Sequence, residues 1–420
     1  MTQQELELPR GWAETEFKKT VKSIPLTGKK LKQKEYLQSG KFPVIDQGQD
    51  FIGGFTDKKE LVVECKLPII VFGDHTKAVK FVNQNFVAGA DGVKVLEPNP
   101  IFNPKLLYYF IHVLPLPNKG YARHYQYLEK LMIKIPPSNE QKRIVSKIEG
   151  LFSKIDSTKK SLEHTKLQLK LYRMSLLKSA FEGKLTKKWR EKNTLKFSWE
   201  FEEIQNICDV KGRVGWKGYT KNDLVDNGAL VIGAKHITKE NTIDISQPVF
   251  IKPEKYNESP EIQIKKGDIL LCHIGASIGK IALVKNELGK ATINPNVNLL
   301  KNIKINKNFL LYVLSSSKYQ RIIWSGNSSS ATPMITQGFI KKIKIPVPQR
   351  IEEQEQIVSQ IEQGFFLIEN SQRIVNSTLQ TLETMRMSVL KQAFQGKLVL
   401  QDPNDEPASV LLERIKKQKS

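Results

Sequence analysis

The chain has 420 residues, which exceeds what one hydrophobic core usually serves, so we expect at least two domains. Lysine and arginine (66) outnumber aspartate and glutamate (43) and give a net charge of +23, which favours a polyanionic partner, above all nucleic acid. The sequence has neither an apolar span of about 20 residues nor a basic amphipathic helix, and it starts with the polar MTQQELELPRGW, so we expect no membrane contact, no secretory signal and a cytoplasmic location.

The first region, residues 1–134, carries short β-branched runs between turn residues. LPIIVF at 67–72 and FVAGADGVKVL at 86–96 are typical of strands, and NPKLLYYFIHVL from Asn103 is typical of a helix. Residues 135–190 then predict one long helix, which ends in AFEGKL with Gly183 as its C′ residue. Its apolar residues alternate in steps of four and three, the spacing of a coiled-coil seam. The principal seam positions are Ile144, Ile148, Ile155, Leu162 and Leu169, and the spacing continues through Tyr172 to Leu176.

Residues 191–345 repeat the mixture of strand-like and helix-like segments, with GALVIGA at 228–234, GDILLCHIG at 267–275 and a helical stretch from Asn306. Residues 346–420 predict a second long helix and a tail. This helix repeats the first at a constant offset of 213 residues, from Glu140 to Glu353 and from Leu185 to Leu398. The matching seam positions are Ile357, Ile361, Ile368, Val375 and Leu382, and the spacing continues through Met385 to Val389. We therefore predict an α+β protein in which two globular domains alternate with two long helices that pair through their seams.

Several segments resemble one family over nearly the whole chain. In the first domain these are FGDHTKAVKFVNQNFVAGADGVKVL at 72–96 and YARHYQYLEKL at 121–131. In the second they are KKGDILLCHIGASIGKIALV at 265–284 and INPNVNLL at 293–300, and near the end QDPNDEPASVLLERIKK at 401–417. Together with the IPPSNEQ and IPVPQRIEEQ helix starts and the AF-x-GKL helix ends, they make the chain similar to the specificity subunits of type I restriction-modification systems.

The resemblance implies two target recognition domains, each recognising one half of a split site in double-stranded DNA, and two helices that form an antiparallel coiled coil and set the spacer. It also implies two methyltransferase subunits and, in a full complex, two motor-nuclease subunits as partners. The cofactor S-adenosylmethionine would then be bound by the methyltransferase subunit, and this chain would bind none. A tandem repeat joined by antiparallel helices has a pseudo-two-fold axis, which matches the symmetry of duplex DNA. Because the two domain sequences differ, we expect two unlike half-sites.

No catalytic or metal-ligating residues are predicted. IPPS at 135–138 lacks the amide and aromatic residues of an amino-methyltransferase loop, and GASIGK at 275–280 is one residue short of a phosphate loop. Cys65, Cys208 and Cys272 lack metal or disulfide spacing. Two alternatives are a single-chain DNA-modifying enzyme and a helical scaffold protein. The absence of a methyltransferase loop argues against the enzyme, and the net positive charge argues against the scaffold.

The candidates for DNA contact are polar side chains on glycine-containing loops, because base edges are recognised by donors and acceptors that reach into a groove. In the first domain they are Gln47, Gln49, His75, Lys77, Arg123 and His124. In the second domain they are Lys211, Arg213, Lys217, His236, Ser277, Asn327 and Ser328, with Trp216 beside them.

Overall fold

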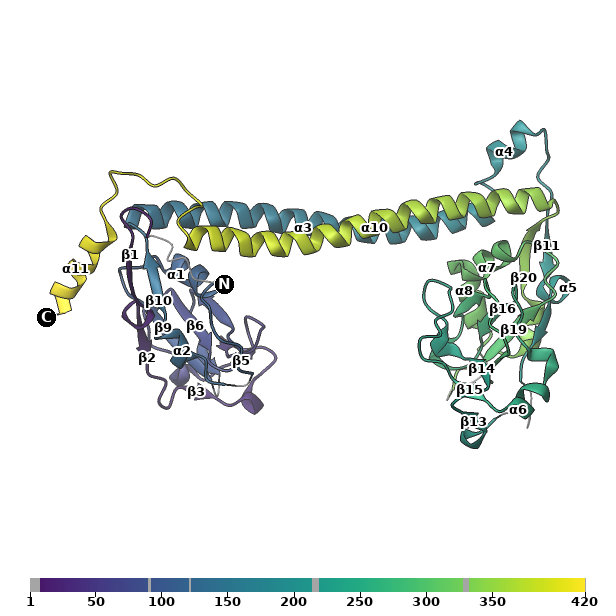
Figure 1. The fold of residues 1–420 in the computed structure, drawn as a ribbon, viewed down its shortest axis with the longest axis horizontal. Helices are drawn as coiled ribbons and strands as arrows, with labels where there is room; N and C mark the ends of the chain where they lie inside the picture. The colour runs from purple at the N-terminus through teal and green to yellow at the C-terminus, as the bar shows by residue number, and fades with distance from the viewer. Residues whose placement is uncertain (1–7, 90–91, 121, 214–218, 328–331, 420) are drawn as a thin grey trace. The chain divides into compact units, whose positions relative to one another are not determined.

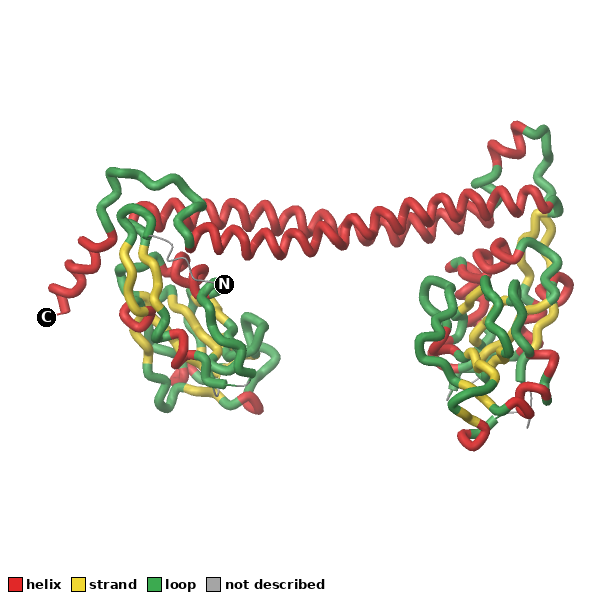
Figure 2. The backbone as a smooth tube through the Cα atoms, in the orientation of Figure 1, coloured by secondary structure: helices red, strands yellow, loops and turns green. Residues whose placement is uncertain are grey.

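The computed structural model describes residues 8–89, 92–120, 122–213, 219–327 and 332–419. The chain divides into two compact units: unit 1 comprises residues up to 163 together with those from 376 onward, and unit 2 comprises residues 164–375. Each unit contains one globular domain and about half of each long helix, α3 (Ser138–Phe181) and α10 (Ile351–Phe394) (Figures 1 and 2). The predicted α+β class with two long helices is confirmed. The domain boundaries predicted at 134, 190 and 345 stay a prediction, since the division into units passes through the middle of both helices.

The domain of unit 1 contains two four-stranded sheets and one antiparallel pair of strands. The first sheet has the order β2 (Val21–Ile24), β9 (Val93–Pro98), β6 (Ile69–Gly73) and β7 (Val79–Val82), all antiparallel. The second has the order β3 (Lys30–Leu31), β8 (Val87–Gly89), β4 (Phe42–Ile45) and β5 (Gly54–Thr56), with β8 parallel to β3 and to β4. β1 (Ala13–Glu16) pairs with β10 (Met132–Ile135), and the helices are α1 (Pro104–Ile111) and α2 (Tyr125–Leu128).

The domain of unit 2 repeats the first sheet of unit 1 and the central strands of its second sheet, although its sequence is different and the edge strand of the second sheet is added on the opposite side. Its first sheet has the order β12 (Asp209–Lys211), β19 (Val297–Lys301), β16 (Ile269–Cys272) and β17 (Ile281–Leu283). Its second has the order β13 (Leu224–Val225), β15 (Phe250–Ile251), β14 (Ala229–Ile232) and β18 (Ala291–Ile293), with β14 parallel to β18 as β4 is to β8. β11 (Trp199–Glu203) pairs with β20 (Lys344–Pro348). The helices are α5 (Ile204–Ile207), α6 (Pro253–Asn257), α7 (Lys307–Ser315), α8 (Ser317–Ser325) and α9 (Gln337–Lys342).

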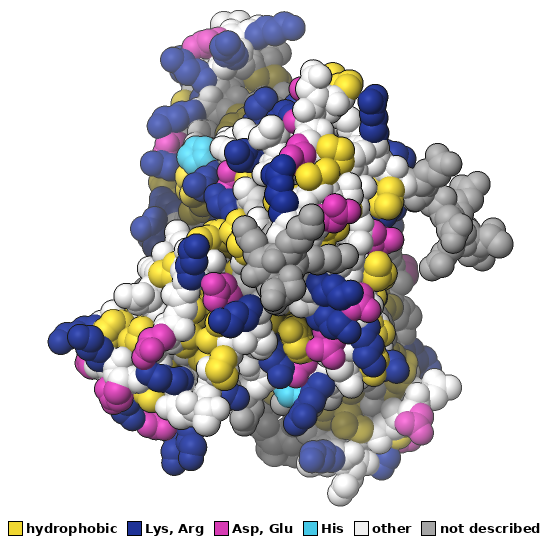
Figure 3. Space-filling model, turned by 90° about the vertical axis from the view of Figure 1, so that its left-hand side faces the viewer, with side chains coloured by type: hydrophobic (Ala, Val, Ile, Leu, Met, Phe, Trp, Pro, Cys, Tyr) yellow, Lys and Arg dark blue, Asp and Glu magenta, His cyan; other side chains and the backbone are white. Residues whose placement is uncertain are grey.

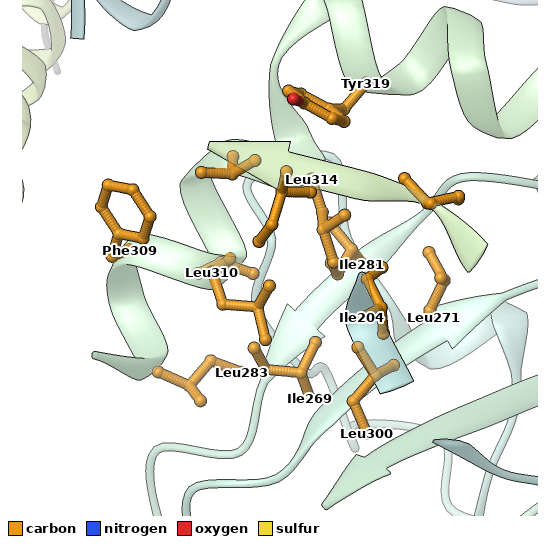
Figure 4. Close-up of a cluster of buried hydrophobic side chains, with 14 of the residues drawn as sticks. Ile204, Ile269, Leu271, Ile281, Leu283, Leu300, Phe309, Leu310, Leu314 and Tyr319 are labelled. Carbon is orange, nitrogen blue, oxygen red and sulfur yellow. The ribbon is translucent and has the colours of Figure 1, made fainter. Parts of the chain in front are cut away.

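The central strands are buried on both faces, which explains their continuous apolar runs. In β16 and β19, Leu270 and Leu299 face the second sheet, whereas Ile269, Leu271 and Leu300 face the helices, in the cluster that Figure 4 shows. The period of two residues in a strand accounts for this alternation. The β6 strand of unit 1 divides in the same way, with its residues shared between two clusters.

The long helices pack against each other in an antiparallel arrangement within each unit. In unit 1, Asp156 accepts from Arg386 at 2.5 Å and Lys159 donates to Glu383 at 2.9 Å. Residue numbers therefore increase along α3 in the direction in which they decrease along α10. In unit 2, the guanidinium of Arg173 lies 3.5 Å from the ring centre of Phe365. The predicted seam positions Ile144, Ile148, Ile155, Ile357, Ile361, Ile368, Val375 and Leu382 are buried, and Leu162 and Leu169 are partly buried. Tyr172 and Met385 are exposed, so their assignment to the seam is wrong.

A repeated hydrogen-bonding arrangement fastens each domain to the helix that follows it. In unit 1 the side chain of Gln141 accepts from the backbone N–H of Asn103, the N-cap of α1, at 2.6 Å, and donates to the carbonyls of Ile101 and Pro136. In unit 2, Gln354 accepts from the backbone N–H of Asn306, the N-cap of α7, at 2.8 Å, and donates to the carbonyl of Pro348. These glutamines are the second residues of the repeated EQ motifs.

Aromatic contacts add the end of the other helix to each domain. Phe110 of α1 lies edge-on to Phe394 at the end of α10, with ring centres 5.1 Å apart. Phe309 of α7 meets Phe181 at the end of α3 in the same way, at 5.6 Å. Phe181 and Phe394 are equivalent positions of the repeat. Each domain is therefore held by the start of one long helix and the end of the other. Two shorter helices follow the long ones, α4 (Lys187–Lys192) after α3 and α11 (Ala408–Lys419) after α10.

Candidate nucleic-acid interface

Three loops of the first domain meet around Asp74, which follows strand β6. The backbone N–H of Asp74 donates to the carbonyl of Gly92 at 2.6 Å, and its carboxylate accepts from the N–H of Tyr125 at 2.7 Å. Its carbonyl accepts from the backbone of His124 at 2.8 Å. The Asp74 main chain and side chain therefore fix the loop before α2 against the β6–β7 turn.

A fourth loop joins this cluster through Gln47. The hydroxyl of Thr76 donates to the Gln47 carbonyl at 2.5 Å, and the side-chain oxygen of Gln47 accepts from the backbone N–H of His75 at 3.3 Å. Gly92 has a φ of +73°, and a Cβ there would collide with Gln47 and His75. The glycine is thus required both by its backbone conformation and by the close approach of these two residues.

The structure brings most of the predicted residues of the first domain to this one cluster of loops. Gln47, His75 and Lys77 are half-buried, and Gln49 and Arg123 are exposed. Lys77, with a φ of +59°, extends to the side-chain oxygen of Asn118 at 3.4 Å. Polar side chains from four separate loops, on a rigid two-sheet support, are what a surface for recognising base edges requires.

The prediction that His124 contacts DNA is corrected by its position in the structure. Its side chain is completely buried, and its Nδ1 lies 3.0 Å from the carbonyl of Asp74. A side chain in this position holds the loop in place and does not extend to a DNA groove. A histidine in a polar loop has no sequence signal that separates these two roles.

In the second domain, three predicted positions lie beside the segment 333–337. Gly275 donates to the carbonyl of Pro333 at 2.8 Å, which places the turn containing half-buried Ser277 against this segment. The side chain of exposed Asn327 accepts from the N–H of Met334 at 3.0 Å. Lys211 is exposed at the end of β12, and its neighbour Gly212 lies against the side chain of Gln337. Lys211, Ser277 and Asn327 thus gather at one part of the domain.

Two other predicted residues of this domain have structural roles. His236 is buried, accepts at Nδ1 from the N–H of Gly233 at 3.0 Å and lies 3.1 Å from the carbonyl of Gln247, and burial lowers its pKa. Its assignment to DNA contact is corrected for the same reason as that of His124. Arg213 donates to the carbonyl of Ile293 at 2.8 Å and to the hydroxyl of Thr292 at 3.3 Å, and burial lowers the pKa of its guanidinium. Arg213 therefore fastens its loop to β18. Trp216, Lys217 and Ser328 lie outside the described residues.

Two buried polar groups were missed from the sequence. Lys80 of β7 is almost fully buried and lies 3.4 Å from Asp46, in the loop that carries Gln47, so it fixes that loop from below. Asn298 of β19 is fully buried, and neither atom of its amide has a hydrogen-bond partner among the described residues. The only sequence signal for either residue is one polar residue inside an apolar run, in AVKFV and in VNLL.

On the face that Figure 3 presents, lysine and arginine side chains are widely spread, with acidic side chains between them. Within the described residues, no group of three or more His, Cys, Asp or Glu side chains could hold a metal ion, and no helix has the length and apolar character needed to cross a membrane.

The comparisons with known proteins agree with this architecture. The model of the type I restriction modification DNA specificity domain matches residues 9–166 and 197–377, once over each half of the chain. The chain therefore belongs to the type I restriction modification DNA specificity domain family. The resemblance stated from the sequence is confirmed, and this class of subunit is non-catalytic.

Two curated relatives come from Escherichia coli. The EcoBI specificity subunit is 26% identical over 313 residues, which cover 70% of this chain and 65% of that protein. The EcoDI specificity subunit is 24% identical over 366 residues, which cover 78% of this chain and 79% of that protein. The chain therefore spans slightly less than two thirds of the length of the first relative.

Two solved structures share the fold. The HsdS subunit from Thermoanaerobacter tengcongensis has a TM-score of 0.58 at 17% identity, covering 94% of this chain and all of that chain. A chain from a structural study of complex assembly and conformational transition of the type I R-M system has a TM-score of 0.67 at 17% identity, covering 93% of this chain and 99% of that one.

Proposed function

We propose that the chain is the DNA-recognition subunit of a type I restriction-modification complex and that each domain recognises one half of a split DNA site. The observation that carries the proposal is the repeated attachment of two domains of similar topology to two copies of one helix, through Gln141 to Asn103 and through Gln354 to Asn306. Two copies of one binding module on a repeated support suit a duplex, whose backbone has local two-fold symmetry.

The loop clusters described above are the proposed contact surfaces. In the first domain the proposed contacts are Gln47, Gln49, His75, Lys77 and Arg123. In the second they are Lys211, Ser277 and Asn327. Because these two sets differ in chemistry, the two halves of the site are expected to differ in sequence.

The long helices have two proposed roles. They set the separation of the half-sites, and they bind methyltransferase subunits, which contain S-adenosylmethionine and carry out the reaction. Large apolar side chains remain exposed on both helices, among them Leu167, Leu171 and Leu367. Contiguous exposed apolar surface on a helix is typical of a binding site for another protein. In a restricting complex, motor-nuclease subunits join the assembly.

Domain exchange tests the proposal. Residues 1–134 are replaced by the corresponding domain of a family member with another specificity, and the sites methylated in cells by the resulting complex are mapped. We expect one half of the site to change while the other half and the spacer are kept. A change in both halves would show that the domains do not recognise DNA independently. Purified chain alone, incubated with labelled S-adenosylmethionine and DNA, is expected to transfer no methyl group.

A further inference from the structure

The end of the first sheet carries equivalent residues in the two domains. In unit 1, the carbonyl of Asp74, the residue after strand β6, accepts from the backbone N–H of His124 at 2.8 Å. In unit 2, the carbonyl of His273, the residue after β16, accepts from the N–H of Ile335 at 2.9 Å. Each donor lies just before a short helix, α2 or α9. Asp74 and His273 therefore occupy the same position, where the sheet meets the loops proposed to contact DNA.

In unit 1, three residues at this position interact with one another. They are Asp74, Lys94 of β9, which lies opposite the residue two before Asp74, and Tyr125, the first residue of α2. The Asp74 carboxylate accepts from the N–H of Tyr125 at 2.7 Å, and the Lys94 ammonium lies 5.4 Å from the centre of the Tyr125 ring. A cation at this distance is attracted to an aromatic ring. The charged groups of unit 1 at this position thus have partners within the domain.

In unit 2, the equivalent residues are His273, Asn298 of β19 and Gln337, the first residue of α9. Asn298 is fully buried and His273 is 8% exposed. Within the part of the chain that the structure describes, neither the Asn298 amide nor Nδ1 of His273 has a hydrogen-bond partner. A Cβ at Gly212 would collide with the oxygen of Asn298 and the nitrogen of Gln337, so the two amides lie against the same glycine.

The unpaired amide of Asn298 does not serve the stability of the domain. A buried polar group without a partner loses its hydrogen bonds to water and gains none in exchange, so it destabilises the fold. The neighbours of Asn298 on the same face of the sheet, Leu271 and Leu300, are apolar and belong to the buried cluster. A leucine in place of Asn298 would continue that cluster without this cost. The hydrogen-bonding capacity of Asn298 therefore points to a role in binding.

Gln337 is placed to use this capacity at the surface. It is half-buried and lies in the part of the domain where Lys211, Ser277 and Asn327 gather. Its carboxamide presents a donor and an acceptor side by side, which match the N6 amino group and N7 on the major-groove edge of adenine. The two bonds form together only when the amide has one orientation, which a neighbouring amide can fix from behind.

We propose that Gln337 contacts an adenine in the half-site recognised by the domain of unit 2 and that Asn298 is the positioning residue that orients the Gln337 amide for this contact. The proposal rests on the proposed function and adds a pair of residues to the same surface. The Asn298 amide has both donors and an acceptor, so it pairs with either end of the Gln337 amide when Gln337 turns to the base. Binding of the matching base then completes the hydrogen bonds of Asn298, which adds to the discrimination between adenine and other bases.

Selection of bound sequences from a random DNA pool tests the contact with the base. The chain is assembled with the methyltransferase subunit of its own system, and the split sites that wild type and variants select are compared. Gln337→Ala should lower the preference for adenine at one position of one half-site about tenfold or more and leave the other half-site unchanged. The control is Gln349→Ala, which changes an exposed glutamine after strand β20 of the same unit and should keep every preference. An unchanged adenine preference in Gln337→Ala, or a loss of preference for another base, would overturn the proposal.

Asn298→Leu tests the positioning role. It should reduce the preference for adenine at the same position as Gln337→Ala, and the double variant should lose no more than Gln337→Ala alone, because the two residues act as one unit. The melting temperature should equal that of wild type or rise, since an unpaired buried amide is replaced by an apolar side chain. Asn298→Ser keeps one donor and one acceptor and should retain part of the preference. A base preference that stays intact in both Asn298 variants would show that the amide is structural and that the positioning role is wrong, whatever the melting temperature.

The outcomes separate this proposal from the proposed function. If the complex of the wild-type chain selects a split site and that of Gln337→Ala selects the same one, the proposal is wrong while the proposed function stands. If the complex of the wild-type chain selects no site, the proposed function itself fails, and the proposal fails with it.

Discussion

Arg190 of α4 and Glu353 of α10 form a buried ion pair in unit 2. The same carboxylate oxygen accepts from the hydroxyl of Thr186 at 2.8 Å and from the indole N–H of Trp199 at 3.0 Å, and Arg190 also donates to the carbonyl of Gly183 at 2.7 Å. This network fastens the chain leaving α3 to the start of α10.

Removal of the arginine is expected to be costly. Arg190→Ala leaves a buried carboxylate without its cation, which destabilises by about 3–5 kcal/mol. The control is Lys159→Ala, because Lys159 and its partner Glu383 are both largely exposed in unit 1, and an exposed pair of this type contributes about 0–1 kcal/mol. Urea unfolding of both variants measures the difference. Equal losses would show that the burial of the Arg190 pair has no energetic consequence.

Glu140 is the repeat equivalent of Glu353, but Pro403 stands where Arg190 would have its counterpart. Burial raises the pKa of the Glu140 carboxyl above the ordinary 4.5, so the folded protein binds this proton more tightly than the unfolded chain. Its contribution to stability is therefore fully present below pH 4.5 and is lost as the pH rises through the folded-state pKa. We expect Glu140→Gln to keep or raise stability at pH 7 and to flatten that decline. A loss comparable to that of Arg190→Ala would contradict this prediction.

Two helical glycines should respond in opposite ways to alanine. In α10, a Cβ at Gly364 would collide with the buried side chain of Leu176, so Gly364→Ala should destabilise by about 1 kcal/mol or more. In α3, no atom lies within 4 Å of a Cβ built at Gly150, so Gly150→Ala should stabilise by about 0.5–1 kcal/mol through helix propensity. Thermal unfolding distinguishes them, and a gain at both positions would mean that the helices do not approach closely at Gly364.

Arg123 and His124 are neighbours with different expected effects. Arg123→Ala should weaken DNA binding by about 1–3 kcal/mol and relax selectivity within one half-site if the side chain contacts a base. His124→Ala removes a buried side chain, so it should lower the stability of the domain. Selection of bound sequences from a random pool, combined with unfolding curves, separates the two effects. A uniform loss of affinity across sequences, with a shallower salt dependence, would instead assign Arg123 to a phosphate.

The proposed role of the helices in setting the spacer is tested by lengthening both. Four residues are inserted between Thr158 and Thr165 and four at the repeat-equivalent place, between Ser371 and Thr378. Four residues add about 6 Å to a helix and nearly preserve the side on which its apolar seam lies. The spacer should therefore grow by about one to two base pairs of roughly 3.4 Å each. Mapping of methylated sites gives the spacer directly, and an unchanged spacer would remove this role from the helices. Insertion into α3 alone is the control, since the contacts of α3 with α10 can then keep their register on only one side of the inserted residues.

The long helices could be predicted from sequence because their signal is repeated. Heptad spacing in two copies identified the seam from Ile144 to Leu169 and from Ile357 to Leu382. It failed at Tyr172 and Met385, which are exposed, although the next predicted seam position of α3, Leu176, is buried and lies against Gly364 of α10.

The topology of the two domains, unlike the long helices, could not be predicted from the sequence. Strand order depends on contacts between residues distant in sequence, and the two domain sequences differ. The loop cluster around Asp74 was found in part, since glycine and polar residues marked the turns that contain Gln47 and His75. His124 and His236 were assigned wrongly because burial depends on which loop covers a side chain, and a single sequence does not contain that information.

The attachment of the domains by Gln141 and Gln354 involves backbone atoms on the domain side. The donors are the main-chain N–H groups of Asn103 and Asn306, and the acceptors are the carbonyls of Ile101, Pro136 and Pro348. Every amino acid has the carbonyl, and all but proline have the N–H group. A domain can therefore diversify almost all of its side chains over evolution without loosening its attachment to the helix, which allows one scaffold to carry many different recognition surfaces.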